Sequence, residues 1–164
     1  MTLPPSGRRR RARPRLAALL LPAAILAASC GAATAFDMAQ AINARSQHFK
    51  AMGRAAKTVQ DELKSQSPNP AIIHAQAQAI DQLAQQLPAW FPPGSGRESG
   101  AKTDAKPEIW SQPAKFQQAV ATFADHARQF DALSAQSAGP QTRVAALQLG
   151  LTCKACHDEF RVPR

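Results

Sequence analysis

The chain has 164 residues, of which 45% are hydrophobic and 19% are charged, and its formal net charge is +9. This length is enough for one domain with a buried core. The charge is unevenly spread, because six arginines and no acidic residue lie within residues 1–35. Residues 36–164 carry 14 Lys/Arg against 11 Asp/Glu, a net charge of +3, which argues against a nucleic-acid-binding protein with a clustered basic patch.

Residues 1–35 are typical of a secretory signal peptide. Arginines precede a short apolar run, and the sequence Ala-Thr-Ala offers a small-residue cleavage site before Phe36. The run is interrupted by Pro22, so we expect no stable membrane anchor. A twin-arginine signal, or lipoprotein cleavage at Cys30, are the alternatives. The mature domain is therefore predicted to comprise residues 36–164 and to be periplasmic.

Four amphipathic helices are predicted in this domain, because apolar residues recur at spacings of three and four. Asp37 is expected to cap the first helix, and Pro68 to end it. Asn69, Gln112 and Gly139 each precede a proline that suits the first position of a helix. The apolar stripes comprise Met38, Ile42, Phe49, Met52, Ala56, Val59 and Leu63; Ile73, Ile80, Leu83 and Leu87; Phe116, Val120, Phe123, Ala127, Phe130 and Leu133; and Val144, Leu147 and Leu151.

A segment of 25 residues rich in proline and glycine, 88–112, separates the second helix from the third. The other connections are short and imply antiparallel neighbours. No stretch alternates with period two, so the fold is predicted to be all-α: an antiparallel up-down-up-down four-helix bundle with a long loop between helices 2 and 3. Trp90 and Trp110 lie in that loop and are expected to pack over the bundle.

Cys153-Lys154-Ala155-Cys156-His157 is the most specific motif of the chain. On a helix the two cysteines lie one turn apart, so both thiols can reach the vinyl-derived carbons at one haem edge. His157 follows as the iron ligand. The motif therefore predicts one covalently attached haem c. A thioredoxin-type redox pair needs a βαβ context and a zinc site needs further ligands nearby, so both alternatives are weaker.

Arg45 falls on the apolar stripe of the first helix. A cation that faces a core is costly unless an anion meets it there, and no acidic residue lies on this stripe. A haem inside the bundle would bring two propionate carboxylates to the interior. We therefore predict that Arg45 binds a propionate through charge-assisted hydrogen bonds, which can be bidentate. The alternative is an arginine whose side chain extends to solvent.

His48 and Phe49 follow about one turn after Arg45. At about 100° per residue, the mean direction of the stripe passes about 30° from Phe49 and about 70° from His48. Phe49 is therefore predicted to face the haem. His48 is expected on the flank, as a surface histidine or, alternatively, a second iron ligand. A phenyl ring has no lone pair, so the iron is predicted to be five-coordinate with His157 as its only protein ligand.

The stretches RSQHFKAMG, WFPPGSG, KPEIWSQPAKF and CKACHDEFR together resemble the class II cytochromes c, and specifically cytochromes c′. The resemblance implies a haem near the C-terminal end of a four-helix bundle and a homodimer packed through the first two helices. Arg45 matches the propionate-binding arginine of the family. Low-spin members carry methionine where this chain has Phe49. Arg161 matches a basic residue beside the proximal histidine that affects gas binding; alternatively, it only supports the helix end.

These observations predict a periplasmic, high-spin haem protein that is not an enzyme. We expect it to bind nitric oxide and, less readily, carbon monoxide, and to exchange electrons with a periplasmic redox partner. The main alternative is a low-spin class II cytochrome c that acts purely as an electron carrier. A peroxidase is weaker still, since it needs a distal acid/base pair to which only His48 could contribute.

Overall fold

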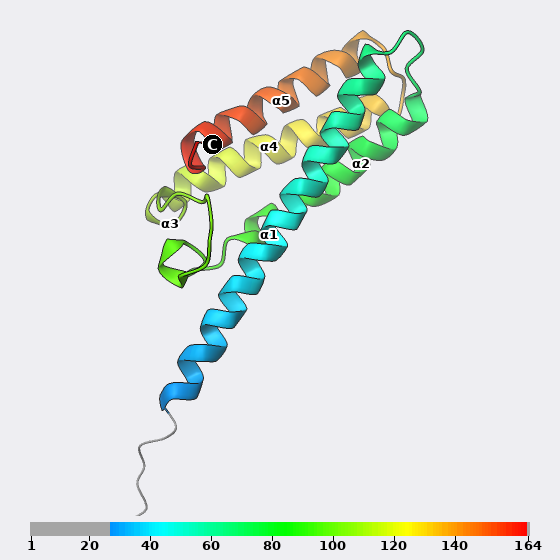
Figure 1. The fold of residues 1–164 in the computed structure, drawn as a ribbon. Helices are drawn as coiled ribbons and strands as arrows, with labels where there is room; N and C mark the ends of the chain where they lie inside the picture. Colours follow the sequence, from blue (N-terminus) through cyan, green and yellow to red (C-terminus); the bar gives the residue numbers. More distant parts are fainter. Residues whose placement is uncertain (1–26, 164) are drawn as a thin grey trace, which may run out of the picture.

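The computed structural model describes residues 27–163, which form an all-helical bundle (Figure 1). Over these residues there is no strand, and a single isolated β-bridge joins Ala105 to Arg161. The elements are α1 (Ala27–Lys64), α2 (Pro70–Gln86), the 3₁₀ helices η1 (Leu87–Trp90) and η2 (Arg97–Ser99), α3 (Glu108–Ser111), α4 (Pro113–Ser134) and α5 (Pro140–Phe160). The predicted four-helix bundle is confirmed, with α1, α2, α4 and α5 as its long helices.

The long helices pack in the order of the chain. α1 packs on α2, α2 on α4 and α4 on α5, whereas α1 and α5 contact each other only sparsely (Figure 1). The crossing loop between α2 and α4 folds against the end of the bundle where α5 ends. The bundle is therefore open along one side, and the loop lies beside that opening.

Local sequence signals account for most helix starts. The Asn69 side chain caps α2 by accepting hydrogen bonds from the backbone N–H of Ala71 (3.0 Å) and Ile72 (3.3 Å). Prolines occupy the first turn of α2, α4 and α5, as predicted. The predicted cap at Asp37 is wrong for this chain, because the alanine-rich residues before it continue the helix and α1 begins at Ala27.

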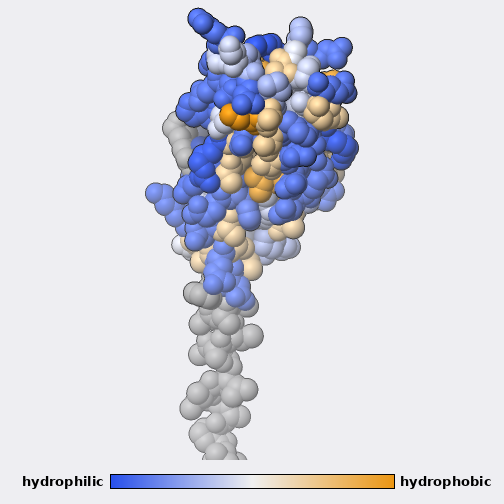
Figure 2. Space-filling view, turned by 90° about the vertical axis from the view of Figure 1, so that its right-hand side faces the viewer, coloured by the Kyte–Doolittle hydropathy of each residue, from blue (hydrophilic) through white to orange (hydrophobic). Residues whose placement is uncertain are grey.

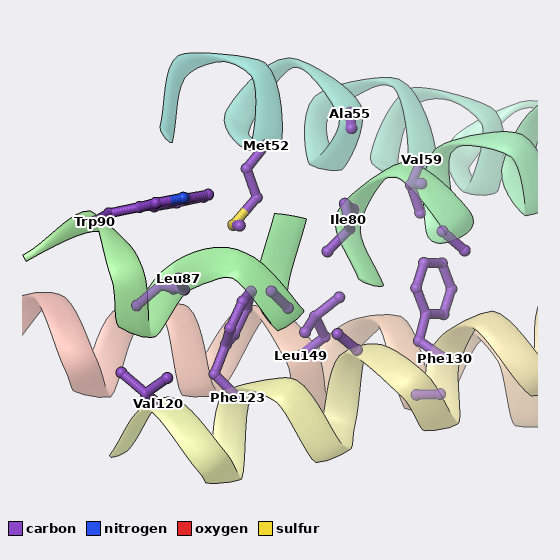
Figure 3. Packing of buried hydrophobic residues seen from close by; sticks show 14 of the residues in the cluster. Met52, Ala55, Val59, Ile80, Leu87, Trp90, Val120, Phe123, Phe130 and Leu149 are labelled. Atoms are coloured by element: carbon purple, nitrogen blue, oxygen red, sulfur yellow. The ribbon is translucent and has the colours of Figure 1, made fainter. Parts of the chain in front are cut away.

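The core joins all four long helices (Figure 3). Most of the predicted inward residues are buried, but Met38, Phe49, Ala56, Leu63, Leu83 and Leu133 are only partly so. Apart from Ala127, the sequence pattern missed the small residues that allow close helix approach. The buried alanines of the long helices are Ala55, Ala77, Ala84, Ala127 and Ala145.

The apolar stripe predicted on the last helix does not face the core. Val144, Leu147 and Leu151 are 57%, 63% and 53% exposed. The buried side of α5 instead carries Leu149 and Phe160, with Ala145 and Thr142. That face extends from Thr142 to Phe160, over most of the helix, and α5 packs mainly against α4.

No helix in the described part of the chain is long and apolar enough to cross a membrane. Figure 2 shows a largely hydrophilic face with a narrow apolar strip. The predicted signal peptide lies outside the described residues as far as residue 26, and residues 27–35 form the first turns of α1. Its cleavage before Phe36, and a lipoprotein site at Cys30, stay predictions.

Phe130 offers a direct test of the packing, because it is only 1% exposed and its ring points into the core that it shares with Val59 of α1 (Figure 3). Phe130→Ala should lower the free energy of unfolding by about 3–5 kcal/mol, as expected for a cavity in a well-packed core. Urea denaturation measures this change. Gln129→Ala, on the exposed side of the same helix, is the matched control and should change stability by less than about 0.5 kcal/mol. A loss below about 1 kcal/mol for Phe130→Ala would contradict the packing.

Candidate functional site

Arg45 is buried, with only 4% of its surface exposed, as the periodicity of the first helix predicted. Its Nη1 donates to the Trp90 carbonyl (3.3 Å) and to Ser95 Oγ (3.1 Å). Its Nη2 donates to the Ser95 carbonyl (3.0 Å) and to Thr103 Oγ1 (2.9 Å). The guanidinium carbon also lies 4.5 Å from the centroid of the Phe91 ring. Arg45 therefore binds the crossing loop at several points.

The charge of Arg45 has no anionic partner in the described structure. Every acceptor that it contacts there is a neutral oxygen, and no carboxylate pairs with it. Burial lowers the pKa of Arg45, although an arginine stays protonated at physiological pH. The four bonds use only Nη1 and Nη2, so Nε–H is the donor that the loop does not engage. The predicted solvent-directed alternative for this side chain is wrong.

The loop is tied to the C-terminal end of α5 as well. The Lys106 N–H donates to the Phe160 carbonyl (3.0 Å), and the Val162 N–H donates to the Asp104 carbonyl (2.8 Å). Arg161 Nε lies 4.0 Å from Asp104 Oδ2, and both side chains are about one-third exposed. The Arg161 N–H donates to the His157 carbonyl and closes the last turn of the helix.

Phe49 and His157 face each other across the open side of the bundle. Their ring centroids are 6.1 Å apart, with an interplanar angle of 66°. Phe49 also makes edge contacts with Trp90 (5.3 Å) and Phe91 (6.2 Å) from the loop. α1 thus presents an aromatic side chain towards the imidazole of α5, in a region that the loop covers only in part, since His157 is exposed and Phe49 is half-buried.

His48 lies beside this region but is engaged elsewhere. Its ring stacks on Trp90, with centroids 4.6 Å apart and an interplanar angle of 16°. The side chain is half-buried, so it is less exposed than a surface histidine would be. Trp90 itself is buried, and Trp110 Nε1 donates to the carbonyls of Phe91 (3.3 Å) and Pro92 (3.2 Å). The expectation that both tryptophans pack over the bundle is confirmed.

Cys153 and Cys156 are free thiols, half-buried and one turn apart on α5. Burial raises the pKa of each thiol to about 11. A backbone hydrogen bond partly opposes this rise at Cys153, whereas the charges of Cys153 and Glu159 add to it at Cys156. Both sulfurs are therefore neutral thiols near pH 7 and are poor nucleophiles and metal ligands in this state.

These features fit a haem better than the alternatives raised by the sequence. The described residues contain no cluster of three or more His, Cys, Asp or Glu that could hold a metal ion, which argues against a zinc site. A thioredoxin-type pair needs a depressed thiol pKa, and here burial raises it. The neighbouring thiols suit the edge of a haem, and the imidazole after them suits its iron. The buried cation of Arg45 suits its carboxylates.

The six candidate residues predicted from the sequence lie together at one end of the bundle. Cys153, Cys156 and His157 share the last turns of α5, and Phe49 faces His157. Two further groups, Arg45 and Arg161, each bind the crossing loop. Sequence reasoning missed the loop residues that hold these arginines: Trp90, Phe91, Ser95, Thr103 and Asp104.

A four-helix bundle whose last helix carries two thiols followed by an imidazole defines a class, the helical-bundle cytochromes. Comparison with known proteins specifies the family. A family model described as Cytochrome C′ matches residues 40–161. The chain therefore belongs to the cytochrome c′ family, whose members are haem proteins and not enzymes, and the family implies a covalently bound haem c.

Similar proteins include a cytochrome c′ from Pararhodospirillum photometricum, which is 35% identical over 117 residues, or 71% of this chain and 92% of the relative. A cytochrome c′ from Rhodopseudomonas palustris is 31% identical over 135 residues, which is 82% of this chain and 90% of the relative. A solved structure of a variant cytochrome c prime from Alcaligenes xylosoxidans, in complex with nitric oxide, is 30% identical with a TM-score of 0.67. It covers 75% of this chain and 94% of that one.

The buried thiols predict a pH dependence of alkylation in haem-free protein. With a pKa of about 11, each thiol is at least about a hundredfold less ionised at pH 7 than an unperturbed cysteine. Iodoacetamide should therefore label folded protein about a hundredfold more slowly than urea-unfolded protein, with a rate that rises steadily towards pH 11. Mass spectrometry measures the rates. Equal rates in the two states at pH 7 would contradict the burial of the thiols.

Proposed function

We propose that this chain is a periplasmic c-type haem protein that binds nitric oxide, and less readily carbon monoxide, at five-coordinate high-spin iron. The observation that carries the proposal is the aromatic ring of Phe49 facing His157 at 6.1 Å. A bound haem would supply an iron atom that can take a diatomic gas as a ligand. Membership of the cytochrome c′ family and the nitric oxide complex of a 30% identical relative support the same function.

In this proposal α5 holds the haem. Cys153 and Cys156 would hold one haem edge through thioethers, because thiols one turn apart on a helix present their sulfurs on the same side. His157 would ligate the iron through a ring nitrogen, and the turn closed by Arg161 fixes its backbone. Arg161 lies next to this proximal ligand and is proposed to influence gas binding from that side.

Phe49 is proposed to close the opposite side. Its phenyl ring offers no lone pair, so it excludes water and protein ligands without bonding to iron. The rings of Trp90 and Phe91 pack against Phe49 and line this side mainly with apolar aromatic carbon. Such a pocket favours ligands that need no hydrogen bond, of which nitric oxide is the strongest.

Arg45 is proposed to balance the charge of a haem propionate. Because the crossing loop engages Nη1 and Nη2, the propionate would be bound through Nε–H and through charge at short range, rather than by the bidentate contact expected from the sequence. A buried cation that has only neutral acceptors supports this role, since an anion beside it would offset the cost of burial.

We also propose that the mature protein is exported, forms a homodimer through α1 and α2, and exchanges electrons with a periplasmic redox partner. The resemblance to the family supports these points. Ile72 on the outer side of α2 is one of the exposed large apolar residues, which suits a helix that packs against a second subunit.

An optical spectrum of the purified haem protein tests the coordination state. The proposal expects high-spin bands in both oxidation states and a clear spectral change when the reduced protein meets nitric oxide. The alternative function, a low-spin electron carrier, expects low-spin bands and no change with the gas. A low-spin, six-coordinate spectrum in both oxidation states would overturn the open-site proposal.

Phe49→Ala tests the distal role of the ring. Removing the phenyl group should open the pocket and raise the affinity of the reduced protein for carbon monoxide by about tenfold or more, because the ligand no longer displaces a packed side chain. Equilibrium titration followed by absorbance measures the affinity. Leu63→Ala, which shortens a partly buried residue near the other end of α1, is the control for general loosening. If carbon monoxide affinity is unchanged, Phe49 does not lie over the iron.

A further inference from the structure

The crossing loop contains a short segment that binds both sides of the candidate site. We call residues 103–106 the strap. At one end of the strap Thr103 Oγ1 accepts a hydrogen bond from Arg45 Nη2 (2.9 Å), and Arg45 lies one turn before Phe49 on α1. Thr103 Oγ1 also accepts from the Ala105 N–H (3.1 Å), which fixes the turn of the strap itself.

At its other end the strap binds the chain just after His157. Lys106 and Asp104 exchange backbone hydrogen bonds with Phe160 and Val162, at 3.0 and 2.8 Å. The carboxylate of Asp104 adds an ion pair with Arg161 at 4.0 Å. Thr103 and Asp104 are neighbours in sequence, so one peptide unit separates the attachment to α1 from the attachment to the end of α5.

We propose that Thr103 and Asp104 are positioning residues that set the separation between Phe49 and His157. α1 and α5 contact each other only sparsely, so few other contacts fix their spacing at this end of the bundle. The strap supplies a short connection between them, bound non-covalently to Arg45 of α1 at one end and to the chain after His157 at the other. This inference rests on the proposed function, because it assigns a consequence to that separation.

The consequence concerns the entry of a gas between Phe49 and the iron. The rings of Phe49 and His157 are already close, with centroids 6.1 Å apart, so a diatomic ligand on that side requires Phe49 or α1 to move outwards. A strap that resists this movement lowers gas affinity. Its hydrogen bonds and ion pair therefore act as a restraint that tunes affinity without contact between the strap and the ligand.

The test uses the full haem-loaded protein and carbon monoxide as the probe. Thr103→Val removes the hydroxyl acceptor at nearly constant volume, and Asp104→Asn removes the charge while its backbone bond remains. Each variant should raise the carbon monoxide affinity about 3- to 10-fold, the range expected for the loss of one hydrogen bond or ion pair. Thr103→Ser keeps the hydroxyl and should retain the affinity of the parent.

Two controls separate positioning from general destabilisation. In a Phe49→Ala background neither strap variant should alter the affinity, because the ligand then has no ring to displace. Ser99→Ala removes a side-chain hydrogen bond to the Gly96 carbonyl within the same loop and should leave gas binding unchanged. The proposal is wrong if the strap variants have parental affinity, or if they raise it equally in the Phe49→Ala background.

Hydrogen exchange keeps the strap inference separate from the proposed function. In the reduced, gas-free protein, amides around Phe49 and amides of residues 157–162 should both exchange faster in Thr103→Val and in Asp104→Asn. If the parent binds neither gas, the proposed function fails. Faster exchange at both sides then still supports the strap as a connection between α1 and α5, and unchanged exchange at either side overturns it.

Discussion

The burial of one positive charge organises the end of the bundle that holds the candidate site. Arg45 projects from α1 into the fold, and Ser95, Thr103 and the Trp90 carbonyl must supply its acceptors. A buried guanidinium without such partners would cost several kcal/mol, so the loop cannot leave α1 without a large penalty. A segment rich in proline and glycine thereby acquires a defined path across the bundle.

That path explains why the site lies between α1 and α5. The loop covers the open side of the bundle with Trp90 and Phe91 and binds the chain after His157. Phe49 is then held opposite the imidazole by aromatic contacts rather than by direct packing of the two helices. A region lined by aromatic rings, with a cation at one edge and two thiols at another, matches the apolar faces and charged edge of a porphyrin.

Most of the fold and part of the site could be predicted from the sequence, because the informative signals are local. Helical periodicity placed Arg45 in the interior, and the spacing of Cys153, Cys156 and His157 defined the attachment motif. The partners of Arg45 could not be predicted, since Ser95 lies in a loop without periodicity and reaches α1 across 50 positions of sequence. Tertiary packing also determined which of its two apolar faces α5 buries. The sequence pattern favoured the face with Val144, Leu147 and Leu151, which is the exposed one.

In the proposed site, the protein would hold iron from one side through His157, while Phe49 would close the other side without bonding. The most direct test is a crystal structure of the haem-loaded, gas-free protein in its reduced state. We expect a bond between a ring nitrogen of His157 and the iron, with the phenyl ring of Phe49 as the nearest group opposite. A sulfur or nitrogen atom bonded to iron on that opposite side, from Met52 or His48, would contradict it, as would the absence of a porphyrin.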